Sequence, residues 1–189
     1  MKKALLALAL VMSVAAARAD IFDINLNATN NPSGILSGLF EVPANASTAT
    51  GGEVGAGIFY DNATSGLTIN AAYGLFGFQP LTSPFTATHL HLAPAGVNGP
   101  VIINLNSGAT DIHTAFTPNS GFFSGTVTLT PVQETALFAN NIYINIHSTV
   151  FPGGEIRAQL IPATVPEPST AAFVGIGLAA LALLRRRRA

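Results

Sequence analysis

Hydrophobic and polar residues alternate along several short stretches in the middle of this 189-residue chain. Ile142, Ile144 and Ile146 lie two positions apart, and residues 67–73 and 156–160 alternate in the same way. A period of two places successive side chains on opposite faces of a β-strand. Clusters of Gly, Asn, Ser and Thr separate these stretches, which is typical of an all-β sandwich or barrel.

The alternation predicts nine strands, at residues 21–26, 35–42, 54–60, 67–76, 85–93, 101–105, 122–129, 141–147 and 155–161. The turn-forming residues of 61–66 and 118–121 predict hairpin loops. One segment departs from the β pattern. Thr130 is followed by Pro131 and Gln133, which predicts a short helix that opens with a capping box and docks through Leu137 and Phe138.

The N-terminal residues have the pattern of an export signal. Lys2 and Lys3 precede the apolar run 4–14, and Ala17 and Ala19 are small residues at the two positions that a signal peptidase reads. The run is too short to span a bilayer, which takes about 20 residues. We therefore predict a signal peptide at 1–19 and a mature chain that starts at Asp20.

A second targeting pattern lies at the C-terminus. Pro-rich sequence from residue 164 marks a linker, then residues 171–184 form an uncharged apolar segment that predicts a short helix. The segment ends at four consecutive cations, which would hold that flank in the cytoplasm. Its signature residues are Val165, Pro166, Glu167 and Pro168, then Arg185, Arg186, Arg187 and Arg188.

This tail, 164–189, resembles the PEP-CTERM sorting signal, in which a Pro-Glu-Pro motif precedes an apolar helix and a basic cluster. The resemblance implies recognition by an exosortase in a Gram-negative bacterium and processing near Pro166–Pro168. It also implies delivery to the cell surface or extracellular matrix, with the tail as a transient membrane anchor. The folded part between the two targeting segments is then a single domain at 20–163.

Charge is distributed unevenly along the chain. Between residues 20 and 163 the sole cation is Arg157, against eight carboxylates, so this domain has a formal charge of −7. A domain without a basic stripe is a poor partner for nucleic acid or anionic lipid. The chain contains no cysteine, so packing and sheet hydrogen bonds must stabilise the domain without disulfides.

Polar residues that could bind a metal or take part in catalysis alternate with the core positions of three predicted strands. His89 and His91 flank Leu90, so both face away from the core, and His147 takes the same side of its own strand. Glu155 and Arg157 alternate with Ile156 in the last strand, where they predict an ion pair or a hold on a loop carbonyl. His113 lies in a loop-like stretch and is expected to be an exposed polar residue.

The domain resembles the CHRD family, which was first named from chordin and also occurs in exported bacterial proteins. The matching blocks are residues 36–38 and 41–43, then HLHLAPAGVNGPV at 89–101, NNIYINIHS at 140–148 and PGGEIRAQL at 152–160. The resemblance covers 34–161 and implies an immunoglobulin-like or related Greek-key β-sandwich of eight or nine strands with one short helix. It implies no activity.

Three interpretations of the histidines remain open. They brace the turn at 96–100 through hydrogen bonds to loop carbonyls, or they bind copper or zinc with water or Glu155 as the fourth ligand, or they take part in catalysis. The pattern faintly resembles the copper site of copper–zinc superoxide dismutases, but that family's disulfide and zinc-binding histidines are lacking.

Local catalytic signatures such as Gly-x-Ser-x-Gly are also lacking, so the sequence favours a non-enzyme without a cofactor. A surface module would act by structural or adhesive contact, with an extracellular matrix protein or polysaccharide as its partner. The alternative function is a metal-binding protein that uses His89, His91 and His147.

Overall fold

The computed structural model describes residues 20–24 and 35–162. The predicted signal peptide and sorting tail lie outside these residues. Within them the fold is all-β with one α-helix, as the alternation predicted, and every strand pair is antiparallel. The strands are β1 (Asp20–Ile24), β2 (Ile35–Ser37), β3 (Thr50–Asp61), β4 (Gly66–Tyr73), β5 (Phe85–Leu92), β6 (Val101–Asn104), β7 (His113–Thr117), β8 (Ser120–Thr128), β9 (Ile142–Ser148) and β10 (Ile156–Pro162).

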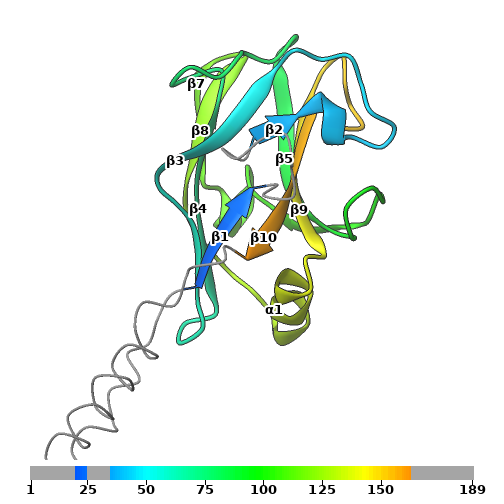
Figure 1. The fold of residues 1–189 in the computed structure, drawn as a ribbon. Helices are drawn as coiled ribbons and strands as arrows, with labels where there is room; N and C mark the ends of the chain where they lie inside the picture. Colours follow the sequence, from blue (N-terminus) through cyan, green and yellow to red (C-terminus); the bar gives the residue numbers. More distant parts are fainter. Residues whose placement is uncertain (1–19, 25–34, 163–189) are drawn as a thin grey trace, which may run out of the picture.

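The strands form one continuous sheet that folds over on itself (Figure 1). The hydrogen-bonded order is β6-β5-β9-β10-β1-β3-β4-β8-β7, and the short β2 pairs with both β10 and β3. Strands β1 and β2 therefore join one half, containing β5, β9 and β10, to the other half, containing β3, β4 and β8. The apolar faces of the two halves share one core, which makes the fold a β-sandwich.

The core contains the residues that the period of two assigned to it. Leu90 of β5, Ile144 of β9 and Ile156 of β10 are fully buried, and so are Ile69 of β4 and Phe123 of β8. Each of these side chains packs in the same apolar cluster. Burying a Leu, Ile or Phe side chain contributes about 1.5–3 kcal/mol, so this cluster can hold a cysteine-free domain together.

Two predicted strands end three or more residues early, the strand expected at 54–60 begins at Thr50, and one strand, β7, was not predicted. The strand expected at 35–42 ends at Ser37, because the Ser37 hydroxyl accepts a hydrogen bond from the Leu39 amide and starts the 3-10 helix η1 (Gly38–Phe40). The strand expected at 67–76 ends at Tyr73, since Gly74 adopts a φ of +64° and turns the chain. Strand β7 was not predicted, because it is an edge strand whose residues after His113 are all exposed.

The expected helix, α1 (Pro131–Phe138), is present with its capping box. The Gln133 amide donates to the Thr130 hydroxyl, and the Thr130 amide donates to the Gln133 side chain. Leu137 is fully buried, whereas Phe138 is 42% exposed and meets the ring of Tyr60 edge-on. The helix lies across the ends of β9 and β10 (Figure 1).

Replacing Thr130 with alanine should lower the free energy of unfolding by about 0.5–2 kcal/mol, because it removes the side-chain cap of α1. Urea denaturation followed by circular dichroism would measure the loss. Thr130→Ser keeps a hydroxyl at the cap and should recover most of the stability. If serine were as destabilising as alanine, the cap would not be the source of the effect.

A candidate metal centre on the polar face of the sheet

Strands β5 and β9 place the three histidines on the face of the sheet opposite the core. The register pairs His91 with Tyr143, His89 with Asn145, and Ala87 with His147. His147 is therefore the diagonal neighbour of His89 on the same face, within reach of a side chain. Leu90 points the other way into the core, as the alternation predicted.

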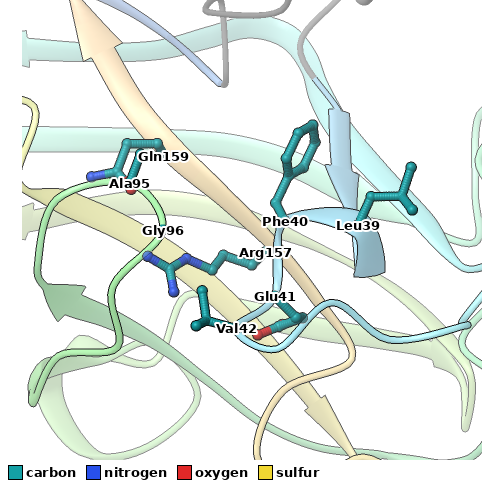
Figure 2. Close-up of a pocket in the computed structure, with 8 residues that line it drawn as sticks. All are labelled: Leu39, Phe40, Glu41, Val42, Ala95, Gly96, Arg157 and Gln159. Atoms are coloured by element: carbon teal, nitrogen blue, oxygen red, sulfur yellow. The ribbon is translucent and has the colours of Figure 1, made fainter.

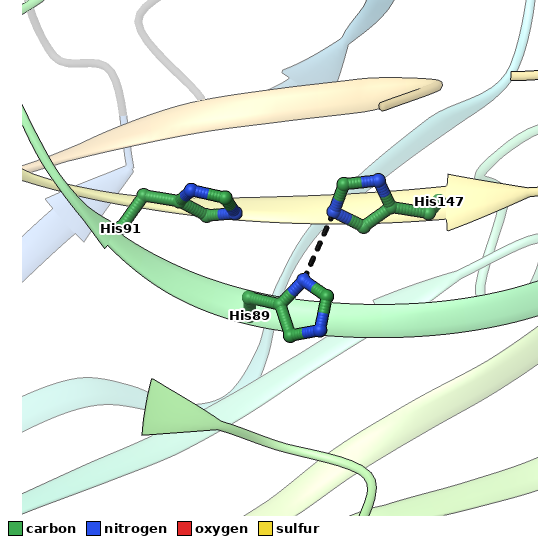
Figure 3. Close-up of side chains that lie close together, drawn as sticks. All are labelled: His89, His91 and His147. Carbon is green, nitrogen blue, oxygen red and sulfur yellow. Dashed lines mark hydrogen bonds between the residues drawn. The ribbon is translucent and has the colours of Figure 1, made fainter. Parts of the chain in front are cut away.

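The structure brings the three imidazoles together (Figure 3). One nitrogen atom from each ring can be chosen so that all three lie within 4.8 Å of one another. His89 Nδ1 is 3.1 Å from His147 Nε2, which is the contact that Figure 3 marks. Three nitrogens bound tetrahedrally at about 2.0–2.1 Å from one ion lie roughly 3.3 Å apart, so the widest pair would close by about 1.5 Å.

Loop carbonyls fix which nitrogen of two rings faces the cluster. His91 Nδ1 lies 2.9 Å from the Gly99 carbonyl, and His147 Nδ1 lies 3.1 Å from the Pro152 carbonyl. A carbonyl only accepts, so both Nδ1 atoms carry a proton and donate it. In a neutral ring the Nε2 atom then carries a lone pair and no proton. Both Nε2 atoms point into the cluster.

The cluster leaves one buried acceptor without a donor. His91 Nε2 has no hydrogen-bond partner among the described residues. His147 Nε2 accepts from His89 Nδ1, so the proton on His89 occupies the space between these two rings. An ion that replaced this proton would meet three nitrogen lone pairs. The hydrogen bonds to Gly99 and Pro152 are of the loop-bracing kind, and they use only the outward-facing nitrogens.

Burial holds the cluster in its neutral form. Desolvation lowers the pKa of His89, of His91 and of His147, and it takes the pKa of His147 to about 4. The hydrogen bonds that His91 and His147 donate to the Gly99 and Pro152 carbonyls oppose this lowering of the pKa, and the neighbouring histidines add to it. The three rings are therefore neutral near pH 7, with one N–H and one lone pair each, and neutral imidazole is the state that ligates a metal.

The polar face around the histidines is itself buried, which the sequence did not predict. All seven residues of β9 are buried, including Tyr143, Asn145 and His147. Residues 38–42, 93–100 and 149–154 supply its cover through hydrogen bonds to Asn145, Arg157 and His147. The domain thus has a second, polar layer outside the sheet.

Glu155 and Arg157 occupy different parts of this layer. The Glu155 carboxylate accepts hydrogen bonds from the Ser47 hydroxyl and from the amide and hydroxyl of Thr82, each at 2.7 Å. Arg157 instead donates to the Val97 carbonyl at 2.8 Å. The sequence had predicted either an ion pair or a contact with a loop carbonyl, and Arg157 makes the second. Glu155 does not belong to the histidine group, so nothing in the geometry supports it as a fourth ligand.

A hollow of about 220 Å³ lies beside Arg157 (Figure 2). Figure 2 shows the guanidinium pointing toward the loop that carries Gly96, with Glu41 and Val42 on the opposite side. Glu41 is 8% exposed, and one of its carboxylate oxygens has no hydrogen-bond partner among the described residues. Desolvation raises the pKa of Glu41 to about 7, although Arg157 and Asn145 act in the opposite direction.

Replacing Glu41 with glutamine should stabilise the domain at pH 8 and not at pH 4.5. The pKa of Glu41 is raised on folding, so the native protein binds more protons than the unfolded chain between pH 4.5 and 7 and loses stability across that window. Glutamine removes this loss, for a gain of about 1–2 kcal/mol at pH 8 after allowance for solvent screening. Urea denaturation at both pH values measures it, and an equal gain at both would contradict the expectation.

His113 differs from the prediction of an exposed loop residue. It begins strand β7 and stacks on Phe85 with ring centroids 4.1 Å apart. Its Nε2 atom lies 2.8 Å from the Tyr73 hydroxyl. The strand pairing of β7 with β8 places it against Phe123, so tertiary contacts make it part of an aromatic cluster. It is not one of the three converging histidines.

Comparison with protein families identifies the folded part of the chain. The CHRD domain family matches residues 18–160, which is more than half of the 189 residues. The chain belongs to the CHRD domain family. All three histidines and the loops that cover them lie inside the matched CHRD region. Comparisons with curated proteins and with solved structures gave no match.

A second match covers the C-terminal residues next to the CHRD domain. The PEP-CTERM protein-sorting motif matches residues 164–188, which include Pro166–Pro168 and the four arginines. The chain is thus an exported surface protein that an exosortase processes. Among residues 20–24 and 35–162, no helix has the length and hydropathy needed to cross a membrane.

Sequence reasoning anticipated hydrogen bonds from the histidines to carbonyls of the turn at 96–100, where Gly99 lies, but it missed Tyr143 and Pro152 as groups that orient the histidines. Tyr143 stacks on His91 with ring centroids 4.7 Å apart and an angle of 9° between the planes. The carbonyls of Gly99 and Pro152 come from two loops that follow different strands. The Pro and Gly residues of these loops signalled turns, but turn chemistry does not reveal where a carbonyl points once the loop folds back on a sheet.

Proposed function

We propose that this CHRD protein is a surface module of the extracellular matrix that binds a transition metal ion, copper or zinc, through His89, His91 and His147. The observation that carries the proposal is the His91 Nε2 lone pair, which is buried without a donor and faces the other two rings. Leaving a buried acceptor unsatisfied costs about 1–3 kcal/mol, and a metal ion in the cluster would satisfy it.

The donor set fits these metals. Neutral imidazole is a good ligand for both copper and zinc, and a carbonyl that accepts from the second ring nitrogen is the usual way to orient such a ligand. The three rings would hold the ion, and water would complete the coordination, because the histidine group contains no carboxylate. The bound ion would supply a Lewis acid or cross-link the loops that cover the site.

The module itself would act by binding and contact. Its formal charge of −7 and its sorting tail support a role in the matrix, where a protein or a polysaccharide is the partner. The proposal assigns no nucleophile–base pair, which hydrolytic chemistry would need. We therefore propose a non-enzymatic role, with the metal as a structural or adhesive element.

Elemental analysis tests the metal proposal. The purified domain, residues 20–163, would be exposed to copper or zinc, dialysed, and its bound metal measured. We expect one ion per chain and a higher melting temperature in its presence, because an ion that binds the native state stabilises it. If the domain retained no metal and its melting temperature did not change, the metal site would be wrong, and only the proposed role in binding by surface contact would remain.

A further inference from the structure

Arg157 forms part of a layered stack that ends at His91. Strand β9 lies between β5 and β10, and the register pairs Tyr143 with His91 of β5 and makes Arg157 of β10 its diagonal neighbour. The Arg157 guanidinium carbon is 3.4 Å from the centroid of the Tyr143 ring. The opposite neighbour, His91, lies nearly parallel to the same ring. Arg157 is 1% exposed, so this arrangement is inside the protein.

Arg157 also holds the loop at residues 93–100 in place. Its guanidinium donates to the Val97 carbonyl at 2.8 Å and to the Asn98 side-chain oxygen at 3.2 Å. Asn98 in turn donates to the Val42 carbonyl at 2.7 Å, which ties the loop to the segment after η1. Burying a charge costs free energy unless hydrogen bonds or a partner compensate it, and here the stacking on Tyr143 and these hydrogen bonds do so.

The next residue of this loop orients His91. The Gly99 amide donates to the Tyr143 hydroxyl at 3.1 Å, and the Gly99 carbonyl accepts from His91 Nδ1 at 2.9 Å. Gly99 has no room for a side chain, because a Cβ atom there would collide with the Leu92 carbonyl. Arg157 therefore reaches His91 by two routes, through the Tyr143 ring and through the Gly99 carbonyl.

We propose that Arg157 is a positioning residue of the metal centre: it fixes the Tyr143 ring and the Gly99 carbonyl so that His91 presents Nε2 to His89 and His147. This inference rests on the proposed function. It assigns a role to the single cation of residues 20–163, whose guanidinium lies on the Tyr143 ring and donates to the Val97 carbonyl.

Lysine could not take over this role. A guanidinium is planar, so it stacks on an aromatic ring while its N–H groups donate in fixed directions within the plane. An ammonium group keeps the charge but lacks both the flat face and the fork. Arg157→Lys therefore tests geometry at constant charge. Tyr143→Phe is a milder second variant, because it keeps the ring and removes the hydroxyl that receives the Gly99 amide.

The experiment compares the full chain with R157K, Y143F and the control E155Q. Glu155 is a buried charged residue of the same segment, but its carboxylate accepts hydrogen bonds from Ser47 and Thr82, which lie outside the loop at 93–100. Calorimetric titration with zinc should show about 10–100-fold weaker binding for R157K, the range found when an orienting partner of a ligand is lost. The zinc affinity of Y143F should lie between that of R157K and that of the wild type, and E155Q should bind zinc as tightly as the wild type does.

A second readout needs no metal. Nitrogen-15 NMR of the metal-free chain reports which nitrogen of His91 carries the proton. Wild type and E155Q should show His91 protonated at Nδ1, and R157K should show a mixture of the two tautomers. Zinc binding within twofold of the wild type together with an unchanged tautomer in R157K would overturn the role of Arg157. If the wild type itself takes no zinc, the proposed function fails, and the tautomer comparison alone decides whether Arg157 orients His91.

Discussion

Replacing His91 with alanine should weaken zinc or copper binding by at least about 100-fold. The change removes one of three nitrogen ligands, which costs more than the 10–100-fold typical of losing an orienting partner. His147→Ala should have a similar effect, since its Nε2 atom also faces the cluster. Isothermal titration calorimetry of the purified protein would measure the affinity of each variant.

His113→Ala is the matched control for these variants. His113 is a partly buried histidine with a lowered pKa, but it stacks in the aromatic cluster of Phe85 and Phe123. Its loss should reduce stability without changing metal affinity. If His113→Ala weakened binding as much as His91→Ala, the effect would come from general destabilisation and the three-histidine site would be wrong.

Gly154→Ala should lower the free energy of unfolding by at least about 2 kcal/mol. Gly154 has a φ of +134°, which a residue with a side chain rarely adopts. A Cβ atom there would also lie 2.5 Å from Asn145 Nδ2 and 2.6 Å from Glu41 Oε1. Both of these side chains are buried in the polar layer, so moving them aside would disturb the packing of that layer.

The neighbouring glycine provides the control. A Cβ atom on Gly153 would meet nothing within 4 Å, so Gly153→Ala should change the free energy of unfolding by no more than about 0.5 kcal/mol. Urea denaturation of both variants gives the comparison. Equal losses for the two would mean that the PGG turn tolerates a side chain at either position, and that the packing of Glu41 and Asn145 against Gly154 contributes little.

The loop that contains Gly154 connects this prediction to the metal centre. Pro152 lies two residues before Gly154, and its carbonyl holds His147 Nδ1. The Gly154 amide donates to the Phe151 carbonyl, which closes the turn around Pro152. A side chain at Gly154 should therefore disturb the orientation of His147 as well as the fold, and zinc affinity should fall in Gly154→Ala but not in Gly153→Ala.

The sequence by itself determined the features that depend on local periodicity and composition. Alternation at Ile142, Ile144 and Ile146 identified core positions, because a strand has a period of two whatever it pairs with. The capping box of Thr130 and Gln133 identified the start of α1, since both partners lie within one helical turn. The sorting motif at 164–188 is likewise a linear pattern.

The tertiary structure alone decided what covers the polar face. Arg157 contacts Val97 sixty positions earlier in the chain, and Asn145 contacts Glu41 across 104 positions. No periodicity links residues so far apart, so alternation predicted that the histidines face away from the core but not that loops bury them. That burial lowers their pKa, and carbonyls of two of those loops fix which nitrogen His91 and His147 present. The residues of the candidate site could thus be found in the sequence, whereas its protonation and direction arise only when three distant loops fold onto one sheet.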